Sequence, residues 1–280
     1  MPRARNGAVE LEYETFGDDR PETILLINGL GSQMTRWPEP FCERLVARGY
    51  RAIRFDNRDV GLSSWLDGQS YTLSDMAADA MAVLDAAGVE RAHVAGVSMG
   101  GMITQKVAID HPHRVLSITS IMSAPGVGPA LQSTPEAAAV LNTPPPDPAA
   151  DFEAFVAHGV KNARIIGSPG YPWDEAALRE RVIAEHRRAF NPEGVARQRR
   201  AIFNDGDRAP DLAKLSVPAV VVHGTHDPLV QPIGGELTAK AVPGAELRVV
   251  EGMGHDLPPG LYDTIVDAIV AAASRARAAA

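Results

Sequence analysis

Three residue types that act together in nucleophilic catalysis occur in this chain in the order serine, aspartate, histidine. Ser98 is the serine of a G-x-S-x-G pattern at residues 96–100. A serine hydroxyl is a weak nucleophile at neutral pH, so it requires a general base and a carboxylate that orients the base. The sequence therefore predicts acyl transfer, with Ser98 as nucleophile, His255 as general base and Asp227 as the orienting acid.

The surroundings of each residue favour this assignment over a chance pattern. Ser98 directly follows an apolar stretch, Ala92–Val97, and directly precedes a helical pattern, Met99–Asp110. A nucleophile in such a turn needs small residues two positions before and after it, because strand and helix approach closely there. Asp227 and His255 each follow a predicted strand as well. Ligands bind at the carboxyl ends of parallel strands in open sheets, so all three residues are expected at that edge.

Neighbouring residues could support other chemistry, but they are less suited to it. Asp256 adjoins His255, and adjacent side chains rarely reach each other in the required geometry, so we expect Asp256 to be a solvated loop residue. His223, His226 and Asp227 resemble part of a metal site, yet no further ligands cluster nearby in the sequence. We predict a reaction that uses neither a metal nor an organic cofactor.

Acyl transfer also needs backbone N–H groups that hold the developing oxyanion. The N–H of Met99, directly after the nucleophile and at the start of a helix, is the expected first donor. The second is expected from the loop Asn28–Ser32, whose glycines allow a tight turn, and Leu30 is the candidate. This loop lacks the glycine spacing of a phosphate-binding loop.

Apolar side chains near these positions could form a pocket for an acyl group. We predict that Trp37, Met122 and Met253 contact the substrate. Methionines also commonly fill gaps in protein cores, so a purely structural role is the competing interpretation.

The elements that must position these residues alternate between strands and helices. Most predicted strands are short, apolar on both faces and rich in β-branched residues, which is typical of a parallel sheet covered by helices. Val9–Phe16 instead alternates apolar and polar residues, as an edge strand does. The buried strands are predicted at Thr23–Ile27, Ala52–Phe55, Ala92–Val97, Val115–Met122 and Ala219–Val222, and a strand at Glu246–Val250 closes the sheet. The helices around them are predicted at Glu39–Arg48, Leu73–Ala87, Met99–Asp110, Gly234–Ala241 and Leu261–Arg275. This order predicts an α/β fold with a doubly wound, mostly parallel sheet.

One interval interrupts the alternation. Between Ala124 and Val217 no buried-strand pattern occurs, and helical patterns around Asp151–Arg164 and Trp173–Phe190 follow a proline-rich link. Insertions of this length in a compact domain are usually functional. We predict a core domain of residues 1–123 and 218–280 and a helical cap of residues 124–217 that roofs the nucleophile.

Composition limits the classes of partner. The chain has 280 residues, and its 27 basic and 35 acidic side chains give a net charge of −8. This charge disfavours nucleic acid and anionic membrane surfaces. The single cysteine, Cys42, cannot form an internal disulfide, and we find neither a signal peptide nor an apolar run long enough to span a membrane. We expect a cytoplasmic protein that acts on a small-molecule ester, and the sequence leaves its oligomeric state open.

With these residues in view, the chain resembles the α/β-hydrolase superfamily over essentially its whole length. Three segments are most similar to bacterial carboxylesterases akin to aclacinomycin methylesterase: R-F-D-N-R-D-V-G-L-S-S at 54–64, H-V-A-G-V-S-M-G-G at 93–101 and G-M-G-H at 252–255. The resemblance implies hydrolysis of a carboxylic ester, such as the methyl ester of a bulky apolar acid, and a structural role for Asp56 and Arg58. Asn28-Gly29 departs from the commoner His-Gly of that superfamily, but the donor expected there belongs to the backbone.

Alternatives remain within and beyond this chemistry. A carbon–carbon bond hydrolase or a perhydrolase would use the same three residues. A non-catalytic ligand-binding homologue would not need them, so the intact set of Ser98, Asp227 and His255 favours an enzyme. A serine at position 98 argues against haloalkane dehalogenases and epoxide hydrolases, which by the resemblance need an aspartate there.

Overall fold

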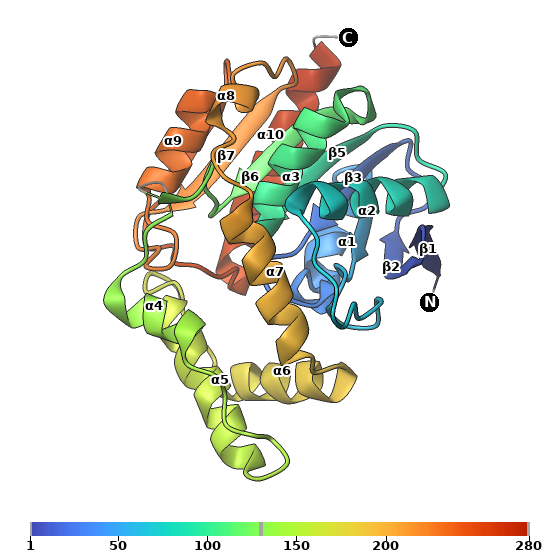
Figure 1. Cartoon of the computed structure of the whole chain (residues 1–280). Coiled ribbons are helices and arrows are strands. Elements are labelled where there is room, and N and C mark those ends of the chain that lie inside the picture. Colours follow the sequence, from blue (N-terminus) through green and yellow to red (C-terminus); the bar gives the residue numbers. More distant parts are fainter. Residues whose placement is uncertain (1, 129–130, 279–280) are drawn as a thin grey trace.

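A β-sheet lies at the centre of the molecule in the computed structural model, which describes residues 2–128 and 131–278 (Figure 1). Within those residues it has eight strands, in the order β1-β2-β4-β3-β5-β6-β7-β8. β1 pairs antiparallel with β2 and β2 with β4, whereas the remaining neighbours are parallel. The strands are β1 (Arg3–Asn6), β2 (Val9–Phe16), β3 (Glu22–Ile27), β4 (Tyr50–Phe55), β5 (Ala92–Val97), β6 (Val115–Ile121), β7 (Ala219–Gly224) and β8 (Glu246–Val250). The predicted doubly wound, mostly parallel sheet is confirmed.

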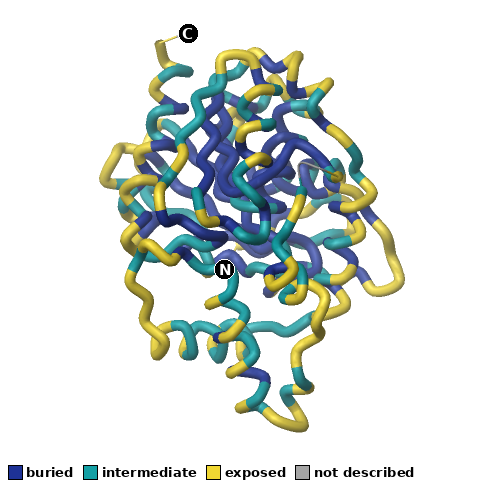
Figure 2. Tube along the Cα trace, turned by 90° about the vertical axis from the view of Figure 1, so that its left-hand side faces the viewer, coloured by how far each residue is buried: buried dark blue, intermediate teal, exposed yellow. Residues whose placement is uncertain are grey.

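Helices cover both faces of this sheet because its strands are apolar on both sides. In β3, Leu25 and Ile27 belong to the core under α2 (Leu73–Ala86) and α3 (Met99–Asp110). Ile24 and Leu26 belong to the core under α1 (Glu39–Ala47) and α10 (Tyr262–Ala278). In Figure 2 the buried residues gather in the interior of the molecule and the exposed residues lie at its periphery. The helices around the sheet are α1 (Glu39–Ala47), α2 (Leu73–Ala86), α3 (Met99–Asp110), α9 (Ile233–Ala241) and α10 (Tyr262–Ala278), with short 3₁₀ turns η1 (Met34–Arg36), η2 (Pro112–Arg114) and η4 (Pro259–Leu261).

A helical insertion separates β6 from β7, as predicted. It contains α4 (Pro135–Asn142), α5 (Phe152–Ile166), α6 (Glu175–Arg188), α7 (Pro192–Asn204) and α8 (Ala209–Leu212). In Figure 1, α5 and α6 project away from the sheet and α7 leads back to it. α5 and α6 share a small core of their own around Phe155, Val156 and Val160. The helical patterns predicted from the sequence correspond to α5 and α6, whereas α4, α7 and α8 were not predicted.

The remaining differences from the sequence-based prediction lie at the ends of elements and at the edge of the sheet. β1 was not predicted, because among its four residues only Ala4 is buried. β4 begins two residues earlier than predicted, at Tyr50, and β7 ends two residues later, at Gly224. Within residues 2–128 and 131–278, no helix combines the length and the apolar character that crossing a membrane requires.

Candidate active site

The turn between β5 and α3 holds Ser98 in a backbone conformation that few residues adopt. Its φ is +56° and its ψ is −122°. Strain of this kind persists only where the surrounding structure enforces it. Here the Ser98 N–H donates to the Ile121 carbonyl at 2.9 Å, and the Ser123 hydroxyl donates to the Ser98 carbonyl at 2.8 Å. The end of β6 and the loop after it therefore fix the turn.

The glycines of the G-x-S-x-G pattern are required by close contacts between backbones. A Cβ atom on Gly96 would lie 2.1 Å from the carbonyl oxygen of Gly100, and one on Gly100 would lie 2.2 Å from the carbonyl oxygen of Ile27. Any larger residue would force β5, α3 and the end of β3 apart.

We expect Gly96→Ala to lower the free energy of unfolding by about 3 kcal/mol or more, at the upper end of what overpacking costs. Urea unfolding followed by circular dichroism measures the change. Gly49→Ala is the matched control, because a Cβ atom on Gly49 would meet no neighbouring atom. Its cost comes only from the positive φ of +90° at this position. That strain is worth about 1–2 kcal/mol. Equal decreases in the free energy of unfolding in the two variants would show that the close contact with the Gly100 carbonyl adds no cost of its own.

The three residues predicted to act together lie in one chain of hydrogen bonds. His255 Nε2 lies 2.9 Å from Ser98 Oγ, and His255 Nδ1 lies 2.7 Å from Asp227 Oδ2. Since an ionised carboxylate only accepts, Nδ1 carries the proton and Nε2 presents a lone pair to the serine hydroxyl. His255 and Asp227 are buried, at 8% and 3% exposure, which strengthens both interactions.

The Asp227 carboxylate is oriented by the backbone of its own loop. Its Oδ1 accepts from the N–H groups of Leu229 and Val230, both at 2.9 Å. This leaves Oδ2 for His255. His223 Nε2 is 3.6 Å from Oδ2 but lies only 2.7 Å from the Val230 carbonyl, to which it donates. Burial lowers the pKa of His223, so it stays neutral there and does not compete for the carboxylate.

Asp256 differs from the solvated loop residue that we predicted. Its Oδ1 accepts from the Ser168 hydroxyl at 2.5 Å, and burial raises the pKa of its carboxyl group. The Ser168 hydroxyl oxygen also accepts from the Gly254 N–H at 2.8 Å. The His255 N–H donates to the carbonyl of Ile166, at the end of α5, at 2.6 Å. The loop of His255 is thus bonded to the insertion, and Asp256 belongs to that contact.

The loop after β3 reaches Ser98. A Cβ atom on Gly29 would lie 3.2 Å from Ser98 Cβ, so this loop packs directly against the serine. Within the described residues, neither the N–H of Met99 nor that of Leu30 has a hydrogen-bond acceptor in the protein. Both donors are therefore uncommitted close to Ser98, as an oxyanion site requires.

The three predicted substrate contacts lie in the interior. Trp37 and Met253 have no exposed surface and Met122 has 2%, and all three belong to the core under α1 and α10. In this conformation they are packed in the core, and their contact with substrate stays a prediction. Cys42 lies in the same core, where burial raises the pKa of its thiol to about 12 and keeps it unreactive.

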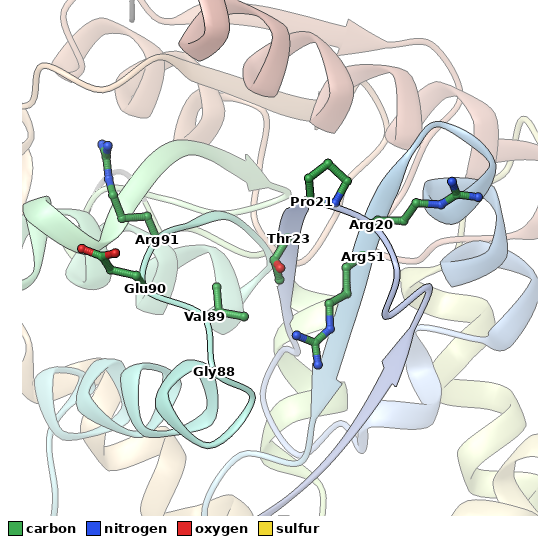
Figure 3. A pocket seen from close by; sticks show the side chains of 8 residues that line it. All are labelled: Arg20, Pro21, Thr23, Arg51, Gly88, Val89, Glu90 and Arg91. Carbon is green, nitrogen blue, oxygen red and sulfur yellow. The ribbon is translucent and has the colours of Figure 1, made fainter.

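A separate surface cavity of about 400 Å³, whose lining side chains Figure 3 shows, lies at the amino ends of the parallel strands. It is lined by the first residues of β3 and β4 and by the loop before β5, including Thr23, Arg51 and Glu90. Ligands of open α/β sheets bind at the carboxyl ends of the strands, so this cavity is unrelated to the Ser98 site. Within residues 2–128 and 131–278, no group of three or more His, Cys, Asp or Glu side chains is placed to hold a metal ion.

Comparison with known proteins identifies a matching family, similar sequences and a similar structure. Residues 19–259 match the family described as serine aminopeptidase, S33. Rhodomycin D methylesterase DnrP of Streptomyces peucetius is 32% identical, over 95% of either chain. The putative carbamate hydrolase RutD of Azorhizobium caulinodans is 30% identical, over 91% of either chain. The structure of a meta-cleavage product hydrolase from Pseudomonas fluorescens IP01 aligns with a TM-score of 0.80 over 99% of this chain and 98% of the other, and at 18% identity it shows the fold alone.

Proposed function

This chain belongs to the serine aminopeptidase S33 family of α/β-hydrolases, and from that premise we propose that it hydrolyses carboxylic esters through an acyl-enzyme on Ser98. The observation that carries the proposal is the continuous chain of hydrogen bonds from Ser98 through His255 to Asp227. A protein that only binds a ligand needs no such chain, so the arrangement favours catalysis over binding alone.

In the first half of the reaction, Ser98 Oγ bonds to the ester carbonyl carbon while His255 Nε2 takes the hydroxyl proton. The carbonyl oxygen becomes an oxyanion, which the N–H groups of Met99 and Leu30 stabilise. As the bond to the leaving oxygen breaks, His255 passes its proton to that oxygen and the alcohol departs. Asp227 keeps the imidazole in the tautomer that can accept from Ser98 and stabilises the imidazolium.

The second half repeats these steps with water in place of the serine. His255 Nε2 takes a proton from water as its oxygen bonds to the acyl carbon, and it returns that proton to Ser98 Oγ as the acyl bond breaks. The products are a carboxylic acid and an alcohol, and the protein ends in its starting protonation state. The residues present supply every proton transfer.

The finer substrate assignment is a small-alcohol ester, such as a methyl ester, of a bulky apolar acid. The methylesterase relative supports the alcohol part. For the acid part we propose that residues 124–217 act as a cap on the core domain of residues 1–123 and 218–280. The bonds that join Ile166 and Ser168 of the insertion to the loop of His255 support this role.

We expect the protein to form a one-to-one covalent adduct with a fluorophosphonate at Ser98, because such probes react with a hydroxyl that a general base activates. Intact-mass analysis, followed by mapping of the labelled peptide, measures it. In parallel, p-nitrophenyl esters of short and long acids should be hydrolysed, and p-nitroanilides of the same acids should not. Absence of both adduct and ester turnover would contradict the proposal, and faster anilide cleavage would point to a peptidase instead.

A further inference from the structure

The loop that carries the proposed second oxyanion donor is held at both ends by side-chain amides from other parts of the chain. At its start, Asn57 Nδ2 donates to the carbonyl of Asn28 at 3.1 Å. At its end, the N–H of Gly31 donates to Gln198 Oε1 at 2.9 Å. Leu30 lies between these two anchored residues, so the direction of its N–H depends on both anchors.

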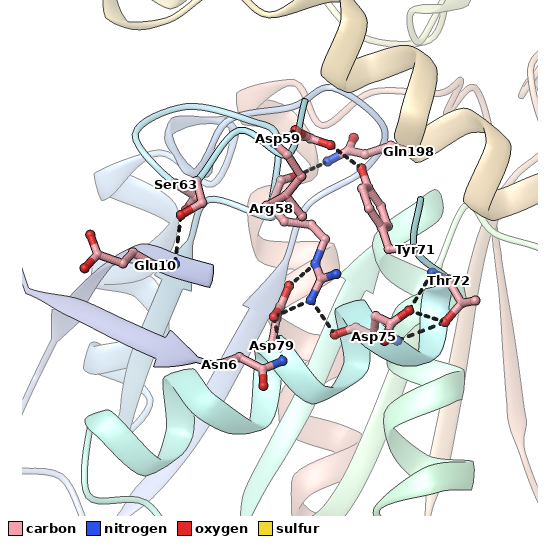
Figure 4. A network of polar contacts seen from close by, with 12 residues as sticks. Asn6, Glu10, Arg58, Asp59, Ser63, Tyr71, Thr72, Asp75, Asp79 and Gln198 are labelled. Atoms are coloured by element: carbon pink, nitrogen blue, oxygen red, sulfur yellow. Dashed lines mark hydrogen bonds and ion pairs between the residues drawn. The ribbon is translucent and has the colours of Figure 1, made fainter. Parts of the chain in front are cut away.

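Gln198 lies on α7 of the insertion, and its amide can take only one orientation. The side chain has no exposed surface. Its Nε2 donates to the carbonyl of Arg58 at 2.8 Å, a contact drawn in Figure 4. Because that carbonyl can only accept, Oε1 must face Gly31. The neighbouring Arg197 forms two bonds of 2.8 Å to Asp59, which fix the helix in this position.

The turn that contains Leu30 needs such an anchor. Its ends are joined by a bond of 3.2 Å from the Ser32 N–H to the Gly29 carbonyl, and Gly31 occupies the third position with φ +64°. This geometry requires a positive φ at the third position, which glycine adopts freely. Glycine also adopts other backbone conformations at little steric cost. Backbone sterics alone therefore do not hold Gly31 in this turn, whereas an acceptor opposite the Gly31 N–H does.

We propose that Gln198 is a positioning residue for the oxyanion hole: by holding the Gly31 N–H it keeps the turn of residues 29–32, and with it the Leu30 N–H, in the position that faces the developing oxyanion. The inference rests on the proposed function, because it takes Leu30 as a donor. It assigns α7 a part in the chemical step that is separate from roofing the substrate. Preorganised donors stabilise the transition state more than the bound ester, so losing the anchor should lower kcat and leave KM nearly unchanged.

The test compares Gln198→Met with Gln105→Met in the full-length protein. Methionine keeps the length of the side chain but removes the acceptor. Gln105 is an equally buried glutamine that bonds to the Ala124 carbonyl and to Arg208, away from the Leu30 turn. With a p-nitrophenyl ester, we expect Gln198→Met to lower kcat by about 10- to 100-fold and to change KM by less than about threefold. This decrease in kcat is somewhat smaller than the decrease caused by removing a whole oxyanion donor. Gln105→Met should change both constants by less than about threefold.

A second readout isolates the oxyanion. A phenylboronic acid forms a tetrahedral adduct on Ser98, and its inhibition constant should weaken in Gln198→Met by the same factor as kcat/KM. Gln198→Glu provides rescue, since a neutral carboxyl group can accept from Gly31 and donate to Arg58. Its kcat relative to the unchanged protein should be high at acidic pH and fall as this carboxyl ionises. This variant also keeps the test decisive if Gln198→Met does not fold.

Equal losses in Gln198→Met and Gln105→Met, or a change confined to KM, would overturn the inference while leaving the proposed function intact. An unchanged protein that neither labels at Ser98 nor hydrolyses esters would overturn the proposed function and the inference with it. The two failures are therefore distinguishable by the behaviour of the unchanged protein.

Discussion

Ser98→Ala should abolish ester turnover, lowering kcat by about 10⁴- to 10⁶-fold, because no acyl-enzyme can form without the hydroxyl. The fold should persist, because alanine keeps the backbone groups that hold the turn. The N–H of residue 98 donates to the Ile121 carbonyl, and the carbonyl of residue 98 accepts from the Ser123 hydroxyl. Steady-state hydrolysis of a p-nitrophenyl ester measures the loss, and thermal unfolding checks the fold.

Ser123→Ala is the matched control for this substitution. It also removes a serine hydroxyl next to the turn between β5 and α3, but one that donates to the Ser98 carbonyl. We expect a kcat within about tenfold of the unchanged protein, in line with the loss of one neutral hydrogen bond. If Ser98→Ala retained turnover comparable to that of Ser123→Ala, the nucleophile would have to be another residue.

The core of the fold was predictable because its signals are local. The strands β3 to β7 are short and mostly apolar, and the G-x-S-x-G turn carries its steric requirement in five consecutive residues. Asp227 and His255 could be chosen because each lies in the loop that follows a predicted strand, β7 or β8. Sequence reasoning succeeded where the chemistry and the element that positions it are neighbours along the chain.

Helix α7 illustrates why some elements of the insertion could not be predicted from the sequence. Its start carries recognisable signals, an Asn191 cap that accepts from the Gly194 N–H and a proline at the first turn. Its buried face, however, includes Arg197 and Gln198, so the apolar periodicity of an ordinary core-facing helix is interrupted. The Gln198 contact with Gly31 spans 167 positions in the sequence, and a pairing of that kind has no local signature.

The predicted pocket residues illustrate a second limit. Trp37, Met122 and Met253 were chosen for apolar character near the catalytic positions, and apolar character is equally suited to the core in which they lie. The distinction depends on whether a side chain faces a cavity or its packed neighbours, which one sequence does not encode locally. The same holds for Asp256, whose bond to Ser168 reaches 88 positions away.

Asp227→Asn should lower kcat by about 10³- to 10⁴-fold, whereas Asp256→Asn should lower it by less than about tenfold. The large effect follows from the contacts of the carboxylate. The N–H groups of Leu229 and Val230 require an acceptor at Oδ1, so the amide carbonyl must stay there and the introduced NH₂ must face His255. An NH₂ group cannot accept from Nδ1, so the imidazole shifts to the tautomer with its proton on Nε2, facing Ser98 Oγ.

In that tautomer His255 has no lone pair for the serine proton, although every heavy atom keeps its place. Asp256→Asn preserves an acceptor for the Ser168 hydroxyl and touches neither nitrogen of the imidazole. The measurement is the ratio of kcat values for the two variants with one ester, and labelling by a fluorophosphonate should slow in parallel in Asp227→Asn only. Equal losses in both variants would mean that Asp256 shares the orienting role, and a larger loss in Asp256→Asn would assign that role to it.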